Sequence, residues 1–198
     1  MSRVEENTVL QAVLQLCPES TGESNVELIG SGLDSRVYRI DTDYVVKIYE
    51  PNMGKTFGLT PSHKINAHTR RMREYARITN MLAGNTIGSL AYFWAENLPL
   101  VVSPIVEMRW IDELGCMVSK SMFVYGESVH DRYGDSIYNR PLSSQFAQHL
   151  EELNRSLNFM AHCKGIGLDP INMKYSYQNG QQCIVVTDIC GYINNLKT

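Results

Sequence analysis

Apolar and polar residues alternate with a period of two between Val26 and Tyr49. The alternation runs through the segments VELIG, RVYRI and YVVKIY, which a glycine-containing turn and the acidic turn DTD separate. Successive side chains of a strand point to opposite faces of a sheet, so this pattern predicts half-buried strands. We therefore expect an antiparallel meander over residues 26–49.

Three other segments carry apolar residues at helical spacing. The first covers residues 4–17 and ends before Pro18. The second follows residues 50–66, which we interpret as a loop, and it ends at Gly84. Its apolar stripe consists of Met72, Tyr75, Ile78, Thr79 and Leu82. The third lies within residues 142–165 and carries the stripe Phe146, Leu150, Leu153, Leu157 and Met160.

Further strands are predicted on both sides of a turn and at the end of the chain. Segments 98–111 and 116–125 have strand-like patterns and are joined by the turn DELG. Segments 171–177 and 182–189 flank Asn179-Gly180. That dipeptide favours a tight hairpin turn, so these two strands are expected to pair.

The composition narrows the class of protein. The chain has 198 residues, 43% of them hydrophobic, which is enough for one core or for two small lobes that share a cleft. Its 18 basic and 21 acidic residues give a net charge of −3, so no general attraction to nucleic acid or to an anionic membrane is expected. There is no apolar run long enough for a membrane span, and the N-terminus has acidic residues where a secretory signal has basic ones. We expect a soluble monomer.

The cysteines show no spacing that is typical of a metal site. The chain has five scattered cysteines: Cys17, Cys116, Cys163, Cys183 and Cys190. Their number is odd, and they form no C-x-x-C pair and no histidine-paired ligand spacing. We interpret them as reduced thiols in a cytosol, packed mostly as small hydrophobic side chains.

A glycine-rich turn, IGSGLDSRVY, lies between the first two predicted strands. Gly30 and Gly32 allow backbone amides to approach phosphate oxygens, and Ser35 stands where a third glycine is often found. Two glycines in a hairpin are in most proteins only a turn, so this motif alone is weak evidence.

Lys47 lies within the apolar strand YVVKIY, on the same face as Val45. A buried ammonium requires a counter-charge, and Glu74 on the following predicted helix can provide it. A lysine held in this way can direct its ammonium group to the phosphates of a nucleotide. The alternatives are an exposed edge strand for Lys47 and, for Glu74, a solvated helix face shared with neighbouring arginines.

The segment GIGLDPINMKYSYQNGQQCIVVTDICG resembles the catalytic segment of protein kinases. Leu168, Pro170 and Asn172 match the H-R-D-L-K-P-E-N pattern, and Asp188 falls at the aspartate of D-F-G. The resemblance covers residues 26–191 in order: glycine loop, strand lysine, helix glutamate, hinge-like segment, long helix, catalytic loop and metal-binding aspartate. It implies an α+β, protein-kinase-like fold with an N-lobe antiparallel sheet plus one helix, and a strongly truncated helical C-lobe.

The resemblance also implies domains, cofactors and residue roles. The domains are an N-terminal helix and polar linker over 1–25, which would act as a possible export signal, a kinase N-lobe over 26–125, and the truncated C-lobe over 126–198. The cofactors would be ATP and Mg²⁺. Nucleotide contacts fall on Gly30, Ser31, Gly32, Ser35, Val37, Val45 and Lys47. Metal ligands fall on Asn172 and Asp188, and catalytic roles on Asp169, Lys47 and Glu74.

One position departs from the kinase pattern. Gly167 occupies the place of the usual catalytic aspartate, and Asp169 follows two residues later. Either a rearranged loop brings Asp169 to the acceptor hydroxyl, or the protein is a pseudokinase that acts as a host-protein binding module. A third interpretation of Asp169 is a turn residue that caps its own backbone before Pro170.

Only about ten residues follow Asp188, which leaves no room for an activation segment or an A-P-E motif. Abbreviated kinases of this kind are similar to bacterial type III effectors, and the GSGLDS loop and the length resemble the HopBF family most, and the OspG and NleH kinases more distantly. That resemblance implies secretion into the host cytoplasm and phosphorylation, on serine or threonine, of the host chaperone HSP90. A small-molecule kinase of the aminoglycoside-phosphotransferase type is a further alternative, although such enzymes have a large helical region for the acceptor.

Overall fold

A computed structural model describes these parts of the chain: residues 10, 13–17, 25–31, 35–49, 61–84, 92–93, 98–133, 144–160 and 167–189. The chain divides into two compact units. The first comprises residues 1–76 and 105–123, and the second comprises residues 77–104 and 124–198. The lobe boundaries predicted at 25/26 and 125/126 stay predictions.

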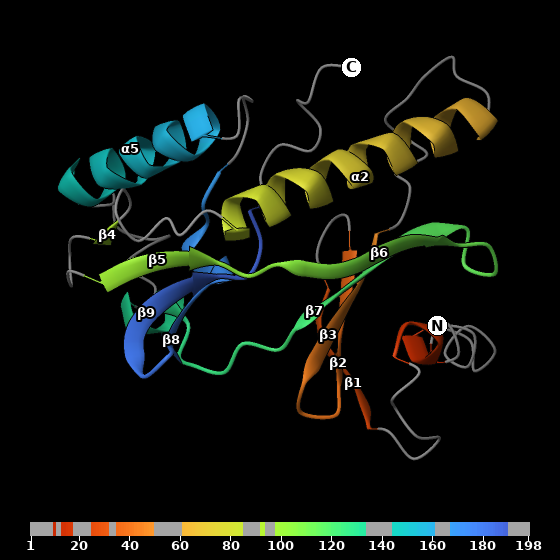
Figure 1. Ribbon diagram of the computed structural model, residues 1–198, viewed down its shortest axis with the longest axis horizontal. Helices are drawn as coiled ribbons and strands as arrows, with labels where there is room; N and C mark the ends of the chain where they lie inside the picture. Colours follow the sequence, from red (N-terminus) through yellow and green to blue (C-terminus); the bar gives the residue numbers. More distant parts are fainter. Residues whose placement is uncertain are drawn as a thin grey trace. The chain divides into compact units, whose positions relative to one another are not determined.

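A five-stranded antiparallel sheet forms the framework of the first unit (Figure 1). Its strand order is β1-β2-β3-β7-β6. The strands are β1 (Val26–Ser31), β2 (Ser35–Ile40), β3 (Tyr44–Tyr49), β6 (Ile105–Ile111) and β7 (Cys116–Met122). The meander predicted over residues 26–49 is therefore confirmed, and the turn predicted at 112–115 joins β6 to β7 as expected.

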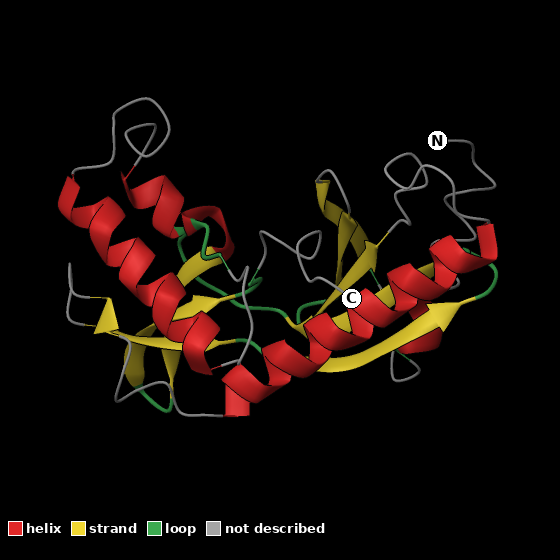
Figure 2. Ribbon diagram, turned by 90° about the horizontal axis from the view of Figure 1, so that it is seen from above, coloured by secondary structure: helices red, strands yellow, loops and turns green. Residues whose placement is uncertain are grey.

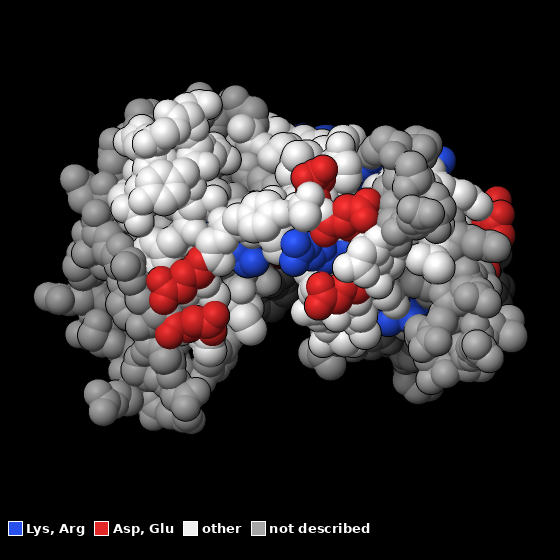
Figure 3. Space-filling model, turned by 90° about the horizontal axis from the view of Figure 1, so that it is seen from below, with Lys and Arg blue, Asp and Glu red and all other residues white. Residues whose placement is uncertain are grey.

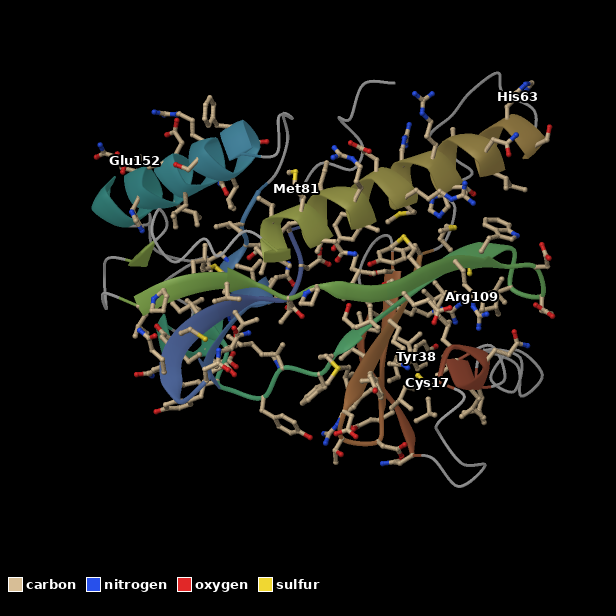
Figure 4. The ribbon with its side chains drawn as sticks, in the orientation of Figure 1. Cys17, Tyr38, His63, Met81, Arg109 and Glu152 are labelled. Carbon is tan, nitrogen blue, oxygen red and sulfur yellow. The ribbon has the colours of Figure 1, made fainter. Side chains whose placement is uncertain are left out.

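One face of this sheet is covered by the N-terminal segment, which is helical at residues 10 and 13–16. Val13, Leu16 and Cys17 are fully buried in a cluster with the inward side chains of β2, β3, β6 and β7, among them Tyr38 and Ile48. Figure 4 shows Cys17, Tyr38 and Arg109 gathered where the segment meets the sheet. The apolar residues predicted at helical spacing before Pro18 are thus part of the core.

Two cations of the sheet bind the C-terminal end of this helical segment. Arg109 Nη2 donates to the Gln15 carbonyl oxygen at 2.6 Å, and Lys120 Nζ donates to the Leu16 carbonyl oxygen at 3.2 Å. Lys120 is only 6% exposed, and its ammonium lies 3.9 Å from the centre of the Tyr44 ring. The last carbonyls of a helix lack intrahelical partners and carry partial negative charge, so the two cations satisfy them and fix the segment to the sheet.

Helix α2 (Pro61–Gly84) begins earlier than the sequence pattern predicted. We expected residues 61–66 to belong to a loop, and this expectation is wrong. Proline is well tolerated at the first position of a helix, where its missing N–H has no partner to lose, so Pro61 starts this helix. The predicted apolar stripe is confirmed, because each of its members is at most 4% exposed: Met72, Tyr75, Ile78, Thr79 and Leu82.

The second unit contains a four-stranded sheet with the order β4-β5-β9-β8. Its strands are β4 (Tyr92–Phe93), β5 (Leu98–Val102), β8 (Met173–Gln178) and β9 (Gln181–Val186). The helical elements are α3 (Val129–Tyr133), α5 (Ser144–Met160) and the 3-10 turn η2 (Pro170–Asn172). Figure 2 shows α5 lying across one side of this sheet, and Leu153 and Leu157 of its predicted stripe are buried. The side chains of Phe146 and Met160 lie outside the described residues.

Two local predictions have different outcomes in this unit. The hairpin turn is confirmed, because Asn179 and Gly180, with φ of 52° and 78°, connect β8 to β9. The single strand predicted over 98–111 is wrong, because Ser103-Pro104 separates β5 from β6, and these strands belong to different sheets. Proline cannot donate to a strand ladder, so a break at Pro104 has a direct physical cause.

The segment 124–128, which follows β7, is attached to the edge strand β8. Lys174 Nζ donates to the Val124 carbonyl oxygen at 3.3 Å, and Tyr175 N donates to the Glu127 carbonyl oxygen at 2.9 Å. Between them Gly126 has a φ of 144°, and a Cβ atom there would overlap the Tyr175 carbonyl oxygen. Only glycine fits this crossing of two backbones.

The described cysteines are buried, as their predicted role as small hydrophobic side chains requires. Cys17, Cys116 and Cys183 are free and buried, whereas Cys163 and Cys190 lie outside the described residues. Burial raises the pKa of the Cys183 thiol, and a hydrogen bond with the Gln178 backbone partly opposes this effect. The neutral thiol is therefore the favoured form.

The described elements confirm the predicted α+β class, with an antiparallel sheet, one long helix and a small helical part. Within the part of the chain that the structure describes, no helix is both long and apolar enough to cross a bilayer.

We expect Gly126→Ala to lower the free energy of unfolding by about 2–4 kcal/mol, because the new methyl group overlaps backbone and the left-handed conformation disfavours alanine. Urea denaturation followed by circular dichroism measures the change. Gly115→Ala is the matched control, since Gly115 has a φ of 61° and its added Cβ meets no atom within 4 Å. Gly115→Ala should lower the free energy of unfolding by only about 1 kcal/mol. Equal losses in the two variants would contradict the close crossing at Tyr175.

We expect Lys120→Met to destabilise the protein by about 1–3 kcal/mol, because it leaves the buried Leu16 carbonyl without its donor while it preserves most of the side-chain volume. Arg109→Met removes the neighbouring bond, but the Arg109 side chain is 42% exposed, so water can replace it and the loss should be about 1 kcal/mol or less. Thermal denaturation of both variants tests this order, and a larger loss for Arg109→Met would contradict it.

Candidate functional site

A row of directly opposed residues crosses the first sheet and includes three of the predicted nucleotide contacts. Gly30 of β1 faces Val37 of β2, Val37 faces Lys47 of β3, and Lys47 faces Ser119 of β7. Directly opposed residues of adjacent strands share a face of the sheet. The strand register therefore aligns Gly30, Val37 and Lys47 on one face.

Steric crowding within the protein does not explain the glycine at position 30. A Cβ atom built there would lie 3.7 Å from Val37 Cβ, which is an ordinary van der Waals contact. The missing side chain instead leaves the backbone of β1 open to close approach. Ser31 ends β1 and Ser35 begins β2, whereas Gly32 lies outside the described residues.

Lys47 lies on the face of β3 opposite to the apolar core. Val46 and Ile48 point into the cluster that the N-terminal segment covers, whereas Val45 and Lys47 are half-buried on the other face. Strand alternation therefore lets β3 supply the core with one set of side chains and the candidate site with the other.

Tyr49 attaches helix α2 to this second face. Its carbonyl oxygen lies 3.2 Å from His68 Nε2, its ring meets the Tyr75 ring edge-on with centroids 6.1 Å apart, and its hydroxyl accepts a hydrogen bond from Ser119 Oγ at 3.2 Å. Tyr49 and Lys47 are two residues apart on one strand, so α2 packs on the face that carries Lys47. Glu74, the neighbour of Tyr75, is half-buried on this helix, and its pairing with Lys47 stays a prediction.

In the second unit, Asp169 forms a capped turn with the residues that follow it. Its Oδ1 accepts a hydrogen bond from Ile171 N at 3.1 Å, and Asn172 N donates to the Asp169 carbonyl oxygen at 2.8 Å. Asp169 is in an extended conformation, and Pro170 starts the 3-10 turn η2. Aspartate before proline favours this geometry, because its side chain can satisfy a free N–H of the turn.

Asn172 is bonded to Thr187, the residue before Asp188. Thr187 N and Oγ1 both donate to the Asn172 carbonyl oxygen, at 2.8 Å and 3.0 Å. Met173 of β8 faces Val186 of β9, so these two hydrogen bonds extend the pairing of the strands by one step. The structure thus brings the backbone of Asn172 and the residue next to Asp188 together at one end of the hairpin.

Asn172 and Asp188 have side chains that suit Mg²⁺. An amide oxygen and a carboxylate oxygen are hard donors, and Mg²⁺ typically takes one or two carboxylates together with water and phosphate oxygens. The described residues contain no group of three histidine, cysteine, aspartate or glutamate side chains that could hold a metal ion.

A further contact fixes the beginning of the candidate loop, and the sequence motifs did not indicate it. Asn154 Oδ1 on α5 accepts a hydrogen bond from Leu168 N at 2.7 Å. Asn154 lies four residues after Leu150 and three before Leu157, within the apolar stripe of α5. A polar residue within an apolar stripe is the one signal in the sequence that could have indicated it.

The predicted site residues belong to two sets. Lys47 and Glu74 are in the first unit with Gly30, Val37 and Val45, whereas Asp169, Asn172 and Asp188 are in the second unit. Each set is assembled by contacts within its own unit. On the face shown in Figure 3, the acidic and basic side chains of described residues lie in small mixed groups rather than in one broad field.

Comparisons with solved structures reveal kinase-like folds. The chain is similar to the PknI kinase domain of Mycobacterium tuberculosis, with a TM-score of 0.46 and 14% identity over 86% of this chain and 60% of that chain. It is also similar to the GDP and kanamycin complex of the aminoglycoside phosphotransferase APH(2″)-IIIa, with a TM-score of 0.40 and 11% identity over 78% of this chain and 44% of that chain. Both TM-scores are below 0.5, so the predicted protein-kinase-like fold stays a prediction.

The chain thus spans about three-fifths of the PknI kinase domain and less than half of the phosphotransferase. No protein-family model and no curated protein sequence matches the chain. The HopBF-type effector family and the assigned site residues stay predictions.

Proposed function

We propose that the protein is an ATP-dependent phosphotransferase. The observation that carries the proposal is the pair of hydrogen bonds from Thr187 to the Asn172 carbonyl oxygen, at 2.8 Å and 3.0 Å. These bonds hold the backbone of Asn172 against Thr187, the residue before Asp188, so a residue with an amide side chain and one with a carboxylate lie at one end of the β8–β9 hairpin. Such a pair suits the magnesium ion of a nucleotide. In the first unit, the aligned Gly30, Val37 and Lys47 are groups of the kind that suit phosphates and a base.

Each residue has one task in the proposed reaction. The backbone of the glycine turn and the Lys47 ammonium bind phosphate oxygens, and Glu74 orients Lys47. Asn172 and Asp188 would hold Mg²⁺, which when bound neutralises charge on the phosphates. Val37 and Val45 provide apolar surface for the nucleotide base. Most of the rate enhancement in phosphoryl transfer comes from such positioning and charge neutralisation.

The transfer step makes one bond to phosphorus and breaks another. An acceptor hydroxyl oxygen bonds to the γ-phosphorus, while the bond from that phosphorus to the bridging oxygen breaks and leaves its electron pair on ADP. The Asp169 carboxylate accepts the hydroxyl proton. A base must lie within hydrogen-bond reach of the proton that it accepts, so the turn at Asp169 decides whether this step is possible.

The finer proposal is a protein kinase with a serine or threonine acceptor, secreted by a bacterial type III system, that phosphorylates and inactivates the host chaperone HSP90. Its support is the sequence resemblance of the glycine loop and the ordered kinase motifs. Purified protein, labelled ATP and Mg²⁺ are to be incubated with a eukaryotic cell lysate and then with purified HSP90. Labelling of other proteins but not of HSP90 would retain the kinase and exclude this target.

We expect Lys47→Ala and Asp188→Ala each to reduce phosphate transfer roughly 100-fold or more, because they remove the phosphate-binding cation and a metal ligand. Transfer of label from ATP measures the loss. The exposed residues Arg73 and Glu152 provide charge-matched controls, and Arg73→Ala and Glu152→Ala should retain full activity. Near-wild-type transfer in either site variant, or no transfer by the wild-type protein with any metal, would overturn the proposal.

A second function, a nucleotide-holding pseudokinase that binds a host protein, has two observations in its favour. Asp169 Oδ1 already accepts the Ile171 N–H, as expected for a purely structural turn residue, and Gly167 occupies the usual position of the base.

Asp169→Asn separates the two functions, because an asparagine oxygen can still accept the Ile171 N–H but cannot act as the base. For the enzyme, we expect turnover to fall roughly 100-fold or more while nucleotide affinity and thermal stability persist. A kinetic assay and calorimetry measure the two properties. Asp169→Ala, which removes both the base and the cap, should lose turnover and stability. Full turnover in Asp169→Asn would exclude Asp169 as the base.

A further inference from the structure

Helix α5 makes a direct side-chain contact with the backbone of the candidate catalytic loop. The contact joins Asn154 Oδ1 and Leu168 N at 2.7 Å, and Leu168 is the residue immediately before Asp169. Asn154 is half-buried, and its side-chain oxygen is the acceptor, so the bond depends on that side chain. The neighbouring bond from Asn158 Nδ2 ends on the Asn154 backbone carbonyl and does not depend on it.

Three successive anchors hold the loop from Leu168 to Asn172. Asn154 fixes its beginning, the cap from Asp169 Oδ1 to Ile171 N fixes its middle, and the two bonds from Thr187 fix its end. The middle anchor is local to the loop, and the last comes from the strand that precedes Asp188. The first comes from a side chain of helix α5, and it acts on the residue immediately before the candidate base.

We propose that Asn154 is a positioning residue that sets the direction of the Asp169 carboxylate, an inference that rests on the proposed phosphotransferase function. Leu168 is restrained twice, because its side chain is buried, at 5% exposed, and its N–H is held by Asn154. Asp169 is bonded directly to Leu168, so a restrained Leu168 limits the positions that Asp169 can take. Small displacements of a reacting group lower the rate by large factors. Removal of the Asn154 side-chain oxygen should therefore reduce turnover, although Asn154 itself does not contact the substrate.

The candidate base and the candidate metal ligands have different anchors. Asn172 and Asp188 have their own anchor at Thr187, which a change at Asn154 leaves intact. Loss of the Asn154 acceptor should therefore lower kcat about tenfold and leave the KM for ATP nearly unchanged. A merely structural residue whose loss loosened the whole unit would instead change both constants.

The test compares Asn154→Ala with Asn154→Asp, and uses Gln148→Ala as the matched control. Aspartate keeps an oxygen that can accept the Leu168 N–H, whereas alanine has none. Gln148 is exposed on the same helix, and its amide lies 3.5 Å from Glu152 Oε1. Amide hydrogen exchange at Leu168 reports the bond itself. We expect exchange to become about fivefold to tenfold faster in Asn154→Ala and to stay slow in the other two variants.

The outcomes separate this inference from the proposed function. Fast exchange and low kcat in Asn154→Ala, with both restored in Asn154→Asp, support the positioning role. Unchanged exchange or unchanged kcat in Asn154→Ala overturns it, as does an Asn154→Asp variant that is as impaired as the alanine variant. If Asn154→Ala fails to fold, Asn154→Asp is compared with the wild-type protein instead. Slow exchange and a normal kcat in Asn154→Asp then support the positioning role, and fast exchange or a low kcat overturns it. Absence of transfer in the wild-type protein would instead remove the proposed function, while hydrogen exchange would still test the anchor.

Discussion

The Asn172 carbonyl oxygen and the two donors of Thr187 form the interaction on which the candidate site depends. A carbonyl oxygen has two lone pairs, and here both donors come from a single residue, one from its backbone and one from its side chain. The bonds therefore restrain Thr187 as a whole, and Asp188 follows it directly. A valine in place of Thr187 would keep the strand pairing but lose one of the two bonds. The chemistry of this end of the hairpin thus relies on a side chain that belongs to no recognised motif position.

In the first unit, one sheet has a buried hydrophobic cluster on one face and the candidate site residues on the other. Alternation along β3 directs Val46 and Ile48 to the core and Lys47 to the opposite face. The N-terminal segment covers the core face and is held there by Arg109 and Lys120. Helix α2 packs on the other face through Tyr49. Lys47 itself is therefore not part of this buried cluster.

Each unit carries its own set of the residues that we assign to the proposed phosphotransferase. The first unit supplies a cation, an open glycine backbone and apolar side chains, which suit a nucleotide. The second unit supplies oxygen donors and a carboxylate, which suit a metal ion and an acceptor hydroxyl. Asn154 adds an anchor from α5 to the beginning of the same loop. The rigid elements of each unit therefore hold groups whose roles require accurate placement.

The sequence by itself determined the features that repeat over a few residues. The period-two pattern located β1, β2 and β3, the helical stripe located the buried face of α2, and Asn179-Gly180 located the β8–β9 turn. Local patterns also indicated Lys47, Asn172 and Asp188 as candidates, because kinase motifs are short and ordered along the chain. The start of α2 at Pro61 and the break at Pro104 were missed, since a proline permits either a helix start or a loop, and either a strand break or an edge strand.

Only the tertiary structure decided which polar groups meet across long separations in the chain. Nothing in the sequence singles out Lys120, yet it is buried and donates to the carbonyl oxygen of Leu16, 104 residues earlier. Asn154 and Leu168 are fourteen residues apart and share no repeating pattern. Each backbone N–H and carbonyl is chemically the same along the chain, so sequence does not reveal which one a given side chain will reach. That choice follows from the packing of whole elements, which brings specific backbone groups within hydrogen-bond distance.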